Sequence, residues 1–294
     1  MIGFKELTYA AGSYLSKHKK LDYDVLFTEL NEKMDRNEPF VVGKIGGTEL
    51  WAIRTVEFGY ADQLDAAYDQ LCNWSGFFSN STDIENNLKK FSARMKKTIS
   101  SVDYLNRWQY PKEEYFVKKY CSDNVKDVDW FGVVYQKRPI GPLLRGKKVL
   151  VVTPFDQTVM KQYEKRSLIY SDDYLPEFDL RTYKAVQTLA GNKDSRFIDW
   201  FEALDFMISE INNIDFDIAL VGAGAYGLPI CSAVKESGRS AIHMGADVQL
   251  LFGIMGKRWE ENAFVQRVRN DYWVYPEKEE IPNNAEKVEG GCYW

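Results

Sequence analysis

The stretch DIALVGAGAYGLPICSAVKE (residues 217–236) sets a short apolar run directly before a glycine-rich turn and a second apolar segment. Residues 217–221 predict a buried strand, and residues 228–236 predict the helix that follows it. Gly238 then predicts the end of that helix, and residues 240–244 predict the next strand. Strands that alternate with helices in this way are typical of a parallel sheet with right-handed crossovers.

The same alternation extends over the rest of the chain. Further strands are predicted over residues 39–45, 147–153 and 180–186, and further helices over residues 22–34, 48–53, 82–102 and 197–211. Thr48 is the expected cap of the helix that follows the Gly46-Gly47 pair. We therefore expect an α/β fold, with a mostly parallel Rossmann-like sheet and flanking helices.

Composition narrows the classes of function. The chain has 294 residues, 45% of them hydrophobic and 28% charged, and its net charge of −5 comes without a basic tract. Nucleic acid is therefore disfavoured as a partner. Four scattered cysteines and two histidines disfavour a zinc site and suit reduced thiols. The chain shows neither a signal peptide nor a transmembrane segment, so we expect a cytoplasmic protein.

A loop over residues 136–146, with two prolines and two glycines, suggests a boundary. It separates an N-terminal α/β portion, residues 1–146, from a Rossmann-like nucleotide-binding portion, residues 147–294. The first portion carries the Gly-Gly-Thr-Glu turn, and the second ends in a short tail. The two portions form either separate domains or one integrated domain.

The glycine turn has the spacing and context of a dinucleotide-binding fingerprint. Glycines let the backbone approach an anion, and the helix start offers free N–H groups to a phosphate. The predicted phosphate-binding residues are Gly222, Gly224, Ala225, Tyr226 and Gly227. We expect Gly224→Val to block phosphate and to leave the fold largely intact. The alternative is a turn that serves packing alone.

The acid that binds the ribose of NAD in such folds is missing, because residues 241–245 read AIHMG. No NAD binding is therefore expected, and a nucleotide-dependent oxidoreductase is disfavoured. A bound nucleotide of another kind is compatible with the turn.

Residues 217–259, the stretch KIGGTE (residues 44–49) and the tail EGGCYW (residues 289–294) resemble an uncharacterised bacterial family of surface-polysaccharide gene clusters. More distantly, the chain resembles the GT-D-fold glycosyltransferases, which transfer a sugar from a nucleotide donor. The resemblance implies a GT-D-like fold and a nucleotide sugar as donor, with a UDP-sugar foremost. It also implies a glycan or lipid-linked acceptor.

GT-D enzymes carry an Asp-x-Glu motif in the first turn, where this chain has Gly47, Thr48 and Glu49. Glu49 matches the second acid, and Gly47 replaces the first. The resemblance makes Glu49 a predicted catalytic residue and a candidate ligand of Mn²⁺ or Mg²⁺, which can bind through one carboxylate plus substrate phosphates. The alternative is an acid that only complements the helix dipole.

Four more residues are candidates for this site. His243 ends a strand, where it can hydrogen-bond phosphate or ribose or move a proton. Asp247 is the second predicted catalytic acid, and Lys257 and Arg258 suit a diphosphate leaving group. The alternatives are a histidine held by a backbone partner and a solvated basic turn.

Aromatic residues beside the motifs are Trp51, Trp74, Tyr226 and Trp259, and such rings can stack on sugars and bases. The tail over residues 289–294 is either part of the site or a docked terminus, and Cys292 needs a nearby base to act as a nucleophile. The leading hypothesis is a sugar transferase. A non-catalytic nucleotide- or glycan-binding protein is the alternative, because Gly47 replaces an acid.

Overall fold

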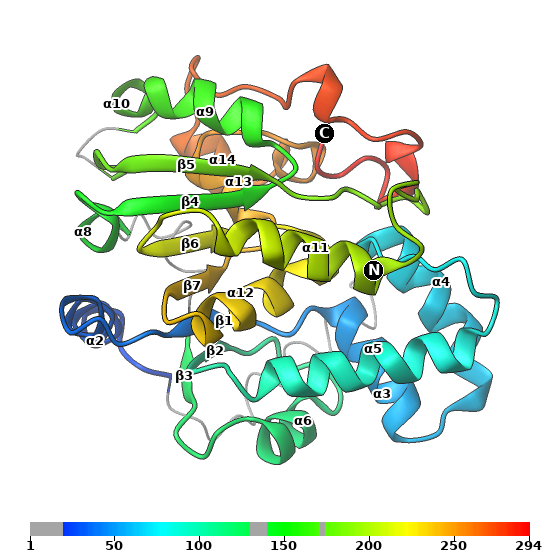
Figure 1. Cartoon of the computed structure of the whole chain (residues 1–294). Coiled ribbons are helices and arrows are strands. Elements are labelled where there is room, and N and C mark those ends of the chain that lie inside the picture. Colours follow the sequence, from blue (N-terminus) through cyan, green and yellow to red (C-terminus); the bar gives the residue numbers. More distant parts are fainter. Residues whose placement is uncertain (1–19, 130–139, 171–173) are drawn as a thin grey trace.

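The computed structural model describes residues 20–129, 140–170 and 174–294. In this part of the chain, seven strands form one sheet, in which every neighbouring pair is parallel (Figure 1). The strands are β1 (Val41–Gly43), β2 (Tyr104–Asn106), β3 (Lys126–Val128), β4 (Lys148–Thr153), β5 (Asp179–Lys184), β6 (Ile218–Val221) and β7 (Ser240–His243). Their order in the sheet is β3-β2-β1-β7-β6-β4-β5.

Helices connect and cover these strands. The α-helices are α2 (Tyr23–Asp35), α3 (Gly47–Glu57), α4 (Leu64–Ser75), α5 (Ile84–Ile99), α6 (Glu113–Tyr120), α8 (Gly141–Leu144), α9 (Asp156–Glu164), α10 (Arg166–Ile169), α11 (Trp200–Asn212), α12 (Gly227–Glu236), α13 (Asp247–Leu251) and α14 (Ala263–Val268). Short 3₁₀ helices are η1 (Ala61–Gln63), η2 (Gly224–Tyr226), η3 (Lys257–Trp259), η4 (Lys278–Glu280) and η5 (Ala285–Lys287). Among the described residues, no helix combines the length and apolar character needed to cross a bilayer.

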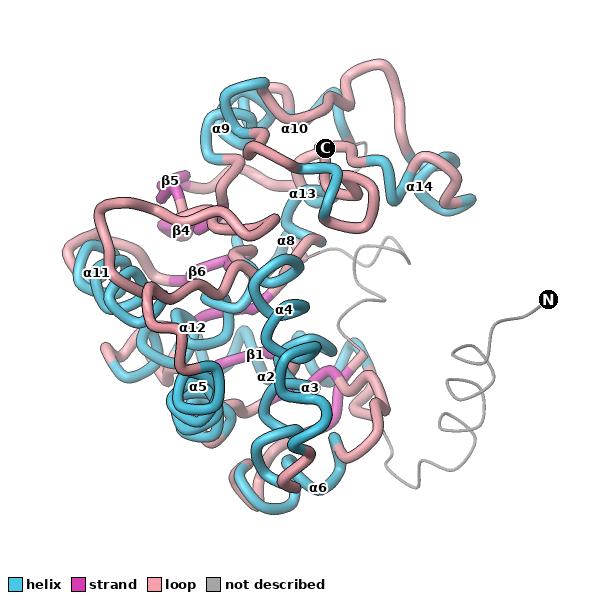
Figure 2. The backbone as a smooth tube through the Cα atoms, turned by 90° about the vertical axis from the view of Figure 1, so that its right-hand side faces the viewer, coloured by secondary structure: helices cyan, strands magenta, loops and turns pink. Residues whose placement is uncertain are grey.

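The sheet lies between two hydrophobic cores. Helices accordingly lie on both sides of the strands (Figure 2). In β4, Val149 and Val151 belong to one core, and Leu150 and Val152 belong to the other. Successive side chains of a strand point to opposite faces, so a strand covered on both sides has to be apolar throughout. The expected α/β fold with a parallel sheet is confirmed.

Different helices cover the two faces of the sheet. The helices α2, α8, α9, α13 and α14 contribute to the core that contains Val149. The helices α3, α4, α5, α6, α11 and α12 contribute to the core that contains Leu150. This three-layer arrangement leaves the carboxyl edge of the sheet to loops.

The N-terminal and C-terminal portions share this sheet. β1 pairs with β7, with Val41 opposite Ala241 and Val42 opposite Ile242. Strands β1 to β3 therefore extend the sheet that β4 to β7 build. The division at residue 146 stays a prediction, and residues 136–139 of the proposed boundary loop lie outside the described residues.

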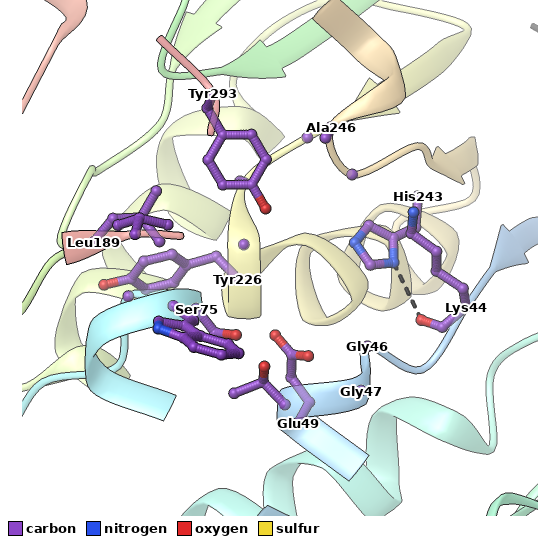
Figure 3. A pocket seen from close by; sticks show the side chains of 18 of the residues that line it. Lys44, Gly46, Gly47, Glu49, Ser75, Leu189, Tyr226, His243, Ala246 and Tyr293 are labelled. Carbon is purple, nitrogen blue, oxygen red and sulfur yellow. Dashed lines mark hydrogen bonds between the residues drawn. The ribbon is translucent and has the colours of Figure 1, made fainter. Parts of the chain in front are cut away.

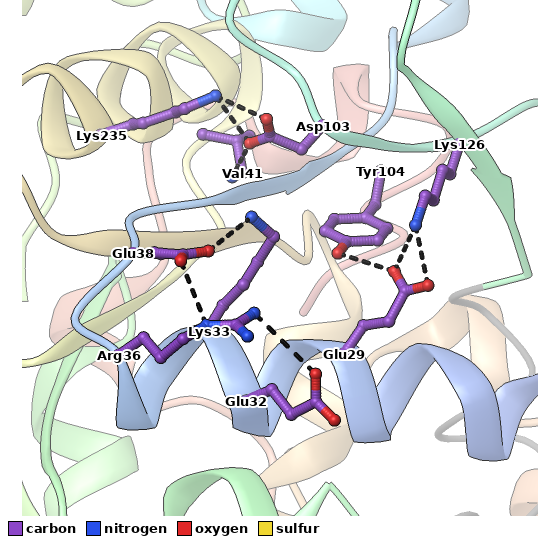
Figure 4. Close-up of polar contacts among 10 residues, drawn as sticks. All are labelled: Glu29, Glu32, Lys33, Arg36, Glu38, Val41, Asp103, Tyr104, Lys126 and Lys235. Carbon is purple, nitrogen blue, oxygen red and sulfur yellow. Dashed lines mark hydrogen bonds and ion pairs between the residues drawn. The ribbon is translucent and has the colours of Figure 1, made fainter.

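Polar contacts fix β1 in the middle of the sheet (Figure 4). The Asp103 carboxylate, just before β2, accepts a hydrogen bond from the Val41 N–H at 2.8 Å and one from the Lys235 ammonium of α12 at 2.7 Å. On the other face of the sheet, Glu29 of α2 accepts hydrogen bonds from Tyr104 of β2 at 3.0 Å and from Lys126 of β3 at 2.7 Å, which fix the two strands beside β1. The bond from Val41 to Asp103 holds β1 itself, whose carboxyl end begins the candidate site.

Candidate functional site

A cavity of about 860 Å³ lies at the carboxyl edge of the sheet (Figure 3). It is lined by residues that end or follow six strands, namely β1, β2, β4, β5, β6 and β7. The end of α4, Arg258 and the tail residues Val288, Glu289 and Tyr293 complete the lining. β4 and β6 are neighbours in the sheet, but the strand that follows β4, which is β5, and the strand that follows β6, which is β7, lie on opposite sides of this pair. A crevice is therefore expected between the carboxyl ends of β4 and β6. Cavities of this size suit small-molecule ligands.

The cavity separates the predicted site residues into two groups. Glu49, Gly222, Gly224, Tyr226, His243 and Arg258 line it. Ala225, Gly227, Asp247 and Lys257 do not line it. The first group brings residues from α3, the turn after β6, the end of β7 and η3 to one place, although their roles in binding and catalysis stay predictions.

Glu49 lies in the first turn of α3 and points into the cavity (Figure 3). The helix is capped by Gly46, so the expected cap at Thr48 is wrong. A Cβ on Gly46 would lie 1.9 Å from a Glu49 carboxylate oxygen, which shows that the carboxylate folds back over the helix start. Burial raises the pKa of Glu49, while its own N–H, the Ser75 hydroxyl and the Lys44 ammonium oppose that rise.

Gly47 stands where the resemblance to GT-D enzymes predicts the first acid of an Asp-x-Glu motif. A Cβ there would lie 2.8 Å from the Tyr110 ring, which comes from the loop after β2. The ring therefore occupies the space that a side chain at position 47 would need. In the part of the chain that the structure describes, no three His, Cys, Asp or Glu side chains form a group that could hold a metal ion.

Lys44 is the cation that sequence reasoning left without a role. It follows β1 and lines the cavity, where its ammonium donates to the Met244 carbonyl at 3.2 Å and lies 5.5 Å from the centre of the Trp108 ring. Burial lowers the pKa of Lys44 to about 8, and the carboxylates of Asp247 and Glu49 oppose that lowering. The signal for it was a single charge within the apolar run of residues 39–45.

His243 ends β7 and is almost fully buried beside Lys44. Its Nδ1 lies 3.2 Å from the Lys44 carbonyl oxygen, so the neutral ring donates from Nδ1 and keeps Nε2 as an acceptor. Burial lowers the pKa of His243 to about 3, and the Lys44 charge adds to this effect. The ring is therefore neutral near pH 7, and it has the backbone partner that the alternative interpretation expected.

Two glycines of the predicted phosphate turn make room for neighbouring parts of the protein. A Cβ on Gly222 would lie 2.4 Å from the Gly245 carbonyl oxygen. A Cβ on Gly227 would lie 2.6 Å from Nε2 of His243. Both glycines are thus explained by close packing between β6, α12 and the end of β7.

Gly224 combines a left-handed backbone with another close approach. Its φ is +52°, and a Cβ would lie 2.6 Å from the Ser75 carbonyl oxygen at the end of α4. The expectation that Gly224→Val leaves the fold largely intact is therefore wrong, because the new side chain has to displace backbone. The backbone of Gly224 still lines the cavity, and its contact with phosphate stays a prediction.

Asp247 and Gln249 belong to α13, directly after β7. Asp247 is 5% exposed, does not line the cavity, and has one carboxylate oxygen without a hydrogen-bond partner among the described residues. Burial raises its pKa, and the Lys44 charge opposes the rise. Gln249 does line the cavity, with its amide oxygen unpartnered in the described structure and its amide nitrogen donating to the Tyr293 carbonyl at 2.9 Å.

The two predicted diphosphate cations are separated. Arg258 lines the cavity, 5.1 Å from the centre of the Tyr293 ring and 3.8 Å from the Glu289 carboxylate. Lys257 is exposed outside the lining, and its ammonium donates to the Gly290 carbonyl at 3.3 Å. Direct contact between Lys257 and a ligand in this cavity is therefore not supported.

The aromatic candidates also divide. Trp51 and Trp74 line the cavity, whereas Trp259 is 3% exposed and lies in the core. The Tyr226 ring stacks on Trp200 at a centroid distance of 5.2 Å, so it is a core ring and not a free stacking surface. The lining also includes Trp108 and Tyr110, which sequence reasoning did not select.

The C-terminal tail docks against the cavity. The Cys292 carbonyl accepts a hydrogen bond from the Arg258 N–H at 3.1 Å, and Tyr293 enters the lining. Burial raises the pKa of Cys292 to about 12, which disfavours the thiolate that a nucleophile requires. The tail is thus a docked segment that also contributes to the cavity.

Over the described ranges, these features define an α/β protein with a seven-stranded parallel sheet and a charged, aromatic cavity at its carboxyl edge. No known protein family model and no curated protein sequence matches the chain. Two solved structures are similar over 74% of this chain and 82% of theirs, with TM-scores of 0.36. One, 13% identical, is a selenomethionine-substituted domain of unknown function 1792. The other, 12% identical, is described as that domain with a distinct glycosyltransferase fold. At this level, the likeness does not bear on activity.

Proposed function

We propose that the protein is a glycosyltransferase that uses a nucleotide-sugar donor, a UDP-sugar foremost, in the cytoplasm. The acceptor would be a glycan or a lipid-linked sugar in surface-polysaccharide assembly. One observation carries the proposal: a single cavity holds the buried Glu49 carboxylate together with the cations Lys44 and Arg258. A diphosphate-linked donor needs cations at its leaving group and a proton acceptor at the incoming hydroxyl.

The proposed reaction uses these groups in different roles. The acceptor oxygen forms a bond to the anomeric carbon, and the bond from that carbon to the diphosphate oxygen breaks with its electron pair leaving on the diphosphate. Glu49 accepts the hydroxyl proton, and the raised pKa of its buried carboxyl suits that role. Arg258 offers a fork of N–H donors to the leaving diphosphate.

Aromatic side chains in the lining support a ligand with flat faces. Trp74 is 37% exposed, and it shares the cavity with Trp108 and Tyr110 from the loop after β2. Such rings stack on the base of a nucleotide or on the apolar face of a sugar. The unpartnered amide oxygen of Gln249 adds an acceptor for a ligand hydroxyl.

A second candidate is a non-catalytic nucleotide- or glycan-binding protein. The Tyr110 ring over Gly47 favours it, because the ring leaves Glu49 as the one acid of that turn. The second candidate predicts binding of the same ligands without turnover. It therefore differs from the transferase in kinetics and not in affinity.

The test is a thermal-shift screen of nucleoside diphosphates and nucleotide sugars, followed by a turnover assay. A ligand that binds only the folded state adds about 2.7 kcal/mol of stability at a hundredfold excess over its Kd. The proposal expects a shift with at least one nucleotide sugar and release of its nucleoside diphosphate, lost in Glu49→Gln. Binding without release would support a non-catalytic nucleotide-binding protein, and the absence of any shift would refute both that protein and the transferase.

A further inference from the structure

The donor set around Glu49 does not fit a divalent metal ion. Beyond the one carboxylate of this turn, Mg²⁺ or Mn²⁺ would have to take every other oxygen ligand from substrate phosphates and water, beside the charge of Lys44 in the same cavity. Gly47 supplies none, and the Tyr110 ring closes the space beside it. The other buried acid nearby, Asp247, does not line the cavity. The proposed reaction therefore uses no metal ion.

A lysine ammonium stands in the same surroundings. The charges acting on Lys44 are those of Asp247, Arg258 and Glu49. Its ammonium donates to the Met244 carbonyl at 3.2 Å, and the lining of the cavity includes Lys44 itself. The positive charges of Lys44 and Arg258 would therefore repel a metal ion that bound near Asp247 and Glu49.

The surroundings of Lys44 are built to hold it. Its carbonyl oxygen is bound by Nδ1 of His243 at 3.2 Å, which fixes the backbone at the end of β1. Gly245 has a φ of +60°, and a Cβ there would lie 2.8 Å from the Lys44 ammonium. A side chain at position 245 would thus push the ammonium out of its place.

We propose that the Lys44 ammonium, bound to the Met244 carbonyl in the same cavity as Glu49, does the electrostatic work of a divalent cation and binds the donor diphosphate without metal. This inference rests on the proposed function. Lys44 neutralises the charge that grows on the leaving diphosphate, and Arg258 shares that charge. The buried Asp247 carboxylate acts as a counter-charge to the ammonium. With its pKa near 8, Lys44 is protonated at neutral pH.

The experiment is calorimetric titration with UDP, GDP, ADP, CDP and dTDP in EDTA and in Mn²⁺. The best binder is then tested on Lys44→Met, Lys44→Arg and Lys184→Met. Lys184 ends β5 at the same edge of the sheet but is exposed outside the lining, so it is a matched control. Thermal melts establish that each variant is folded.

We expect wild-type affinity to agree in EDTA and Mn²⁺ within about twofold. Lys44→Met should bind the nucleotide about tenfold more weakly or worse, which corresponds to the loss of a charge-assisted hydrogen bond. Mn²⁺ should not restore this affinity. Lys44→Arg should lose less, and Lys184→Met should not change. If Lys44→Met is unfolded, Lys44→Arg and the wild-type comparison still decide the matter.

Wild-type binding that needs Mn²⁺ would overturn this inference and leave the proposed function standing, as would a folded Lys44→Met variant with wild-type affinity. Binding of Mn²⁺ to the protein with nucleotide, beyond what free nucleotide binds, would overturn it as well. If none of these nucleoside diphosphates, and no nucleotide sugar of the thermal-shift screen, binds in EDTA or in Mn²⁺, the proposed function itself is refuted.

Discussion

Gly224 offers a test of how closely the glycine turn and α4 approach each other. Gly224→Ala adds one carbon at a backbone φ of +52°, placed 2.6 Å from the Ser75 carbonyl oxygen. A left-handed backbone costs a non-glycine residue about 1–2 kcal/mol. Overpacking against backbone adds roughly 1–3 kcal/mol, because the carbonyl cannot rotate away as a flexible side chain would.

The expected loss is therefore roughly 2–5 kcal/mol in the free energy of unfolding. For a chain of this size, that corresponds to a fall in Tm of about 4–10 °C. Gly238 is the matched control, because it has a φ of +86° just after α12 but nothing within 4 Å of an added Cβ. Gly238→Ala should lose only the backbone contribution, about 1–2 kcal/mol in the free energy of unfolding or some 2–4 °C in Tm.

Differential scanning calorimetry of the wild type and the two variants measures the difference directly. Urea unfolding at one temperature provides the free energies independently. Equal losses in Gly224→Ala and Gly238→Ala would refute the argument, since the contact with Ser75 would then contribute nothing. A smaller loss at position 224 would refute it more strongly.

Three other predictions concern the cavity. Glu49→Gln should lower turnover by about a hundredfold or more, because it removes the proposed base. It should not lower Tm, because the charge that it removes is one that burial disfavours. Steady-state kinetics and thermal melts measure the two effects, and unchanged turnover would exclude Glu49 as the base. Burial lowers the pKa of His243 to about 3 from an ordinary 6.5, so the unfolded chain binds an extra proton between these pH values, and the wild-type protein loses stability as the pH is lowered from 6.5 to 3. His243→Gln should make the free energy of unfolding, measured by urea at several pH values, depend less on pH in this window. An unchanged dependence would contradict the assignment. NAD at about 1 mM should give no saturable calorimetric signal, since the end of β7 offers no acid to the ribose, and saturable binding would disprove this reading.

Strands in the middle of the sheet were predictable from sequence. Residues 147–153 and 217–221 contain β4 and β6, because strands covered on both faces are continuous apolar runs. β2 and β3 escaped prediction, because each spans only three residues. In β3, Lys126 and Asp127 are satisfied by distant partners, Glu29 and Arg107. The hydrophobic pattern of a short stretch of sequence cannot indicate such contacts between residues that are far apart in the chain.

The candidate site was predictable only in part. Glu49 and the glycine turn share a cavity because parallel strands carry their following turns to one edge, which sequence order implies. Lys44 gained its place from the neighbouring order β2-β1-β7, which brings Met244 and Trp108 to it. The glycine spacing suggested a ligand, whereas the structure shows that packing also requires it.

The pairing of β1 with β7 has a consequence for folding during synthesis. Lys44 and Met244, the residues that directly follow these strands, are 200 positions apart in the chain. Until β7 leaves the ribosome, Val41 and Val42 present an unpaired apolar strand edge, which is a template for aggregation. Growth conditions that slow translation or raise temperature should lengthen that exposure. We expect fragments ending before Ser240 to be insoluble, and chaperone demand to fall once β7 has entered the sheet.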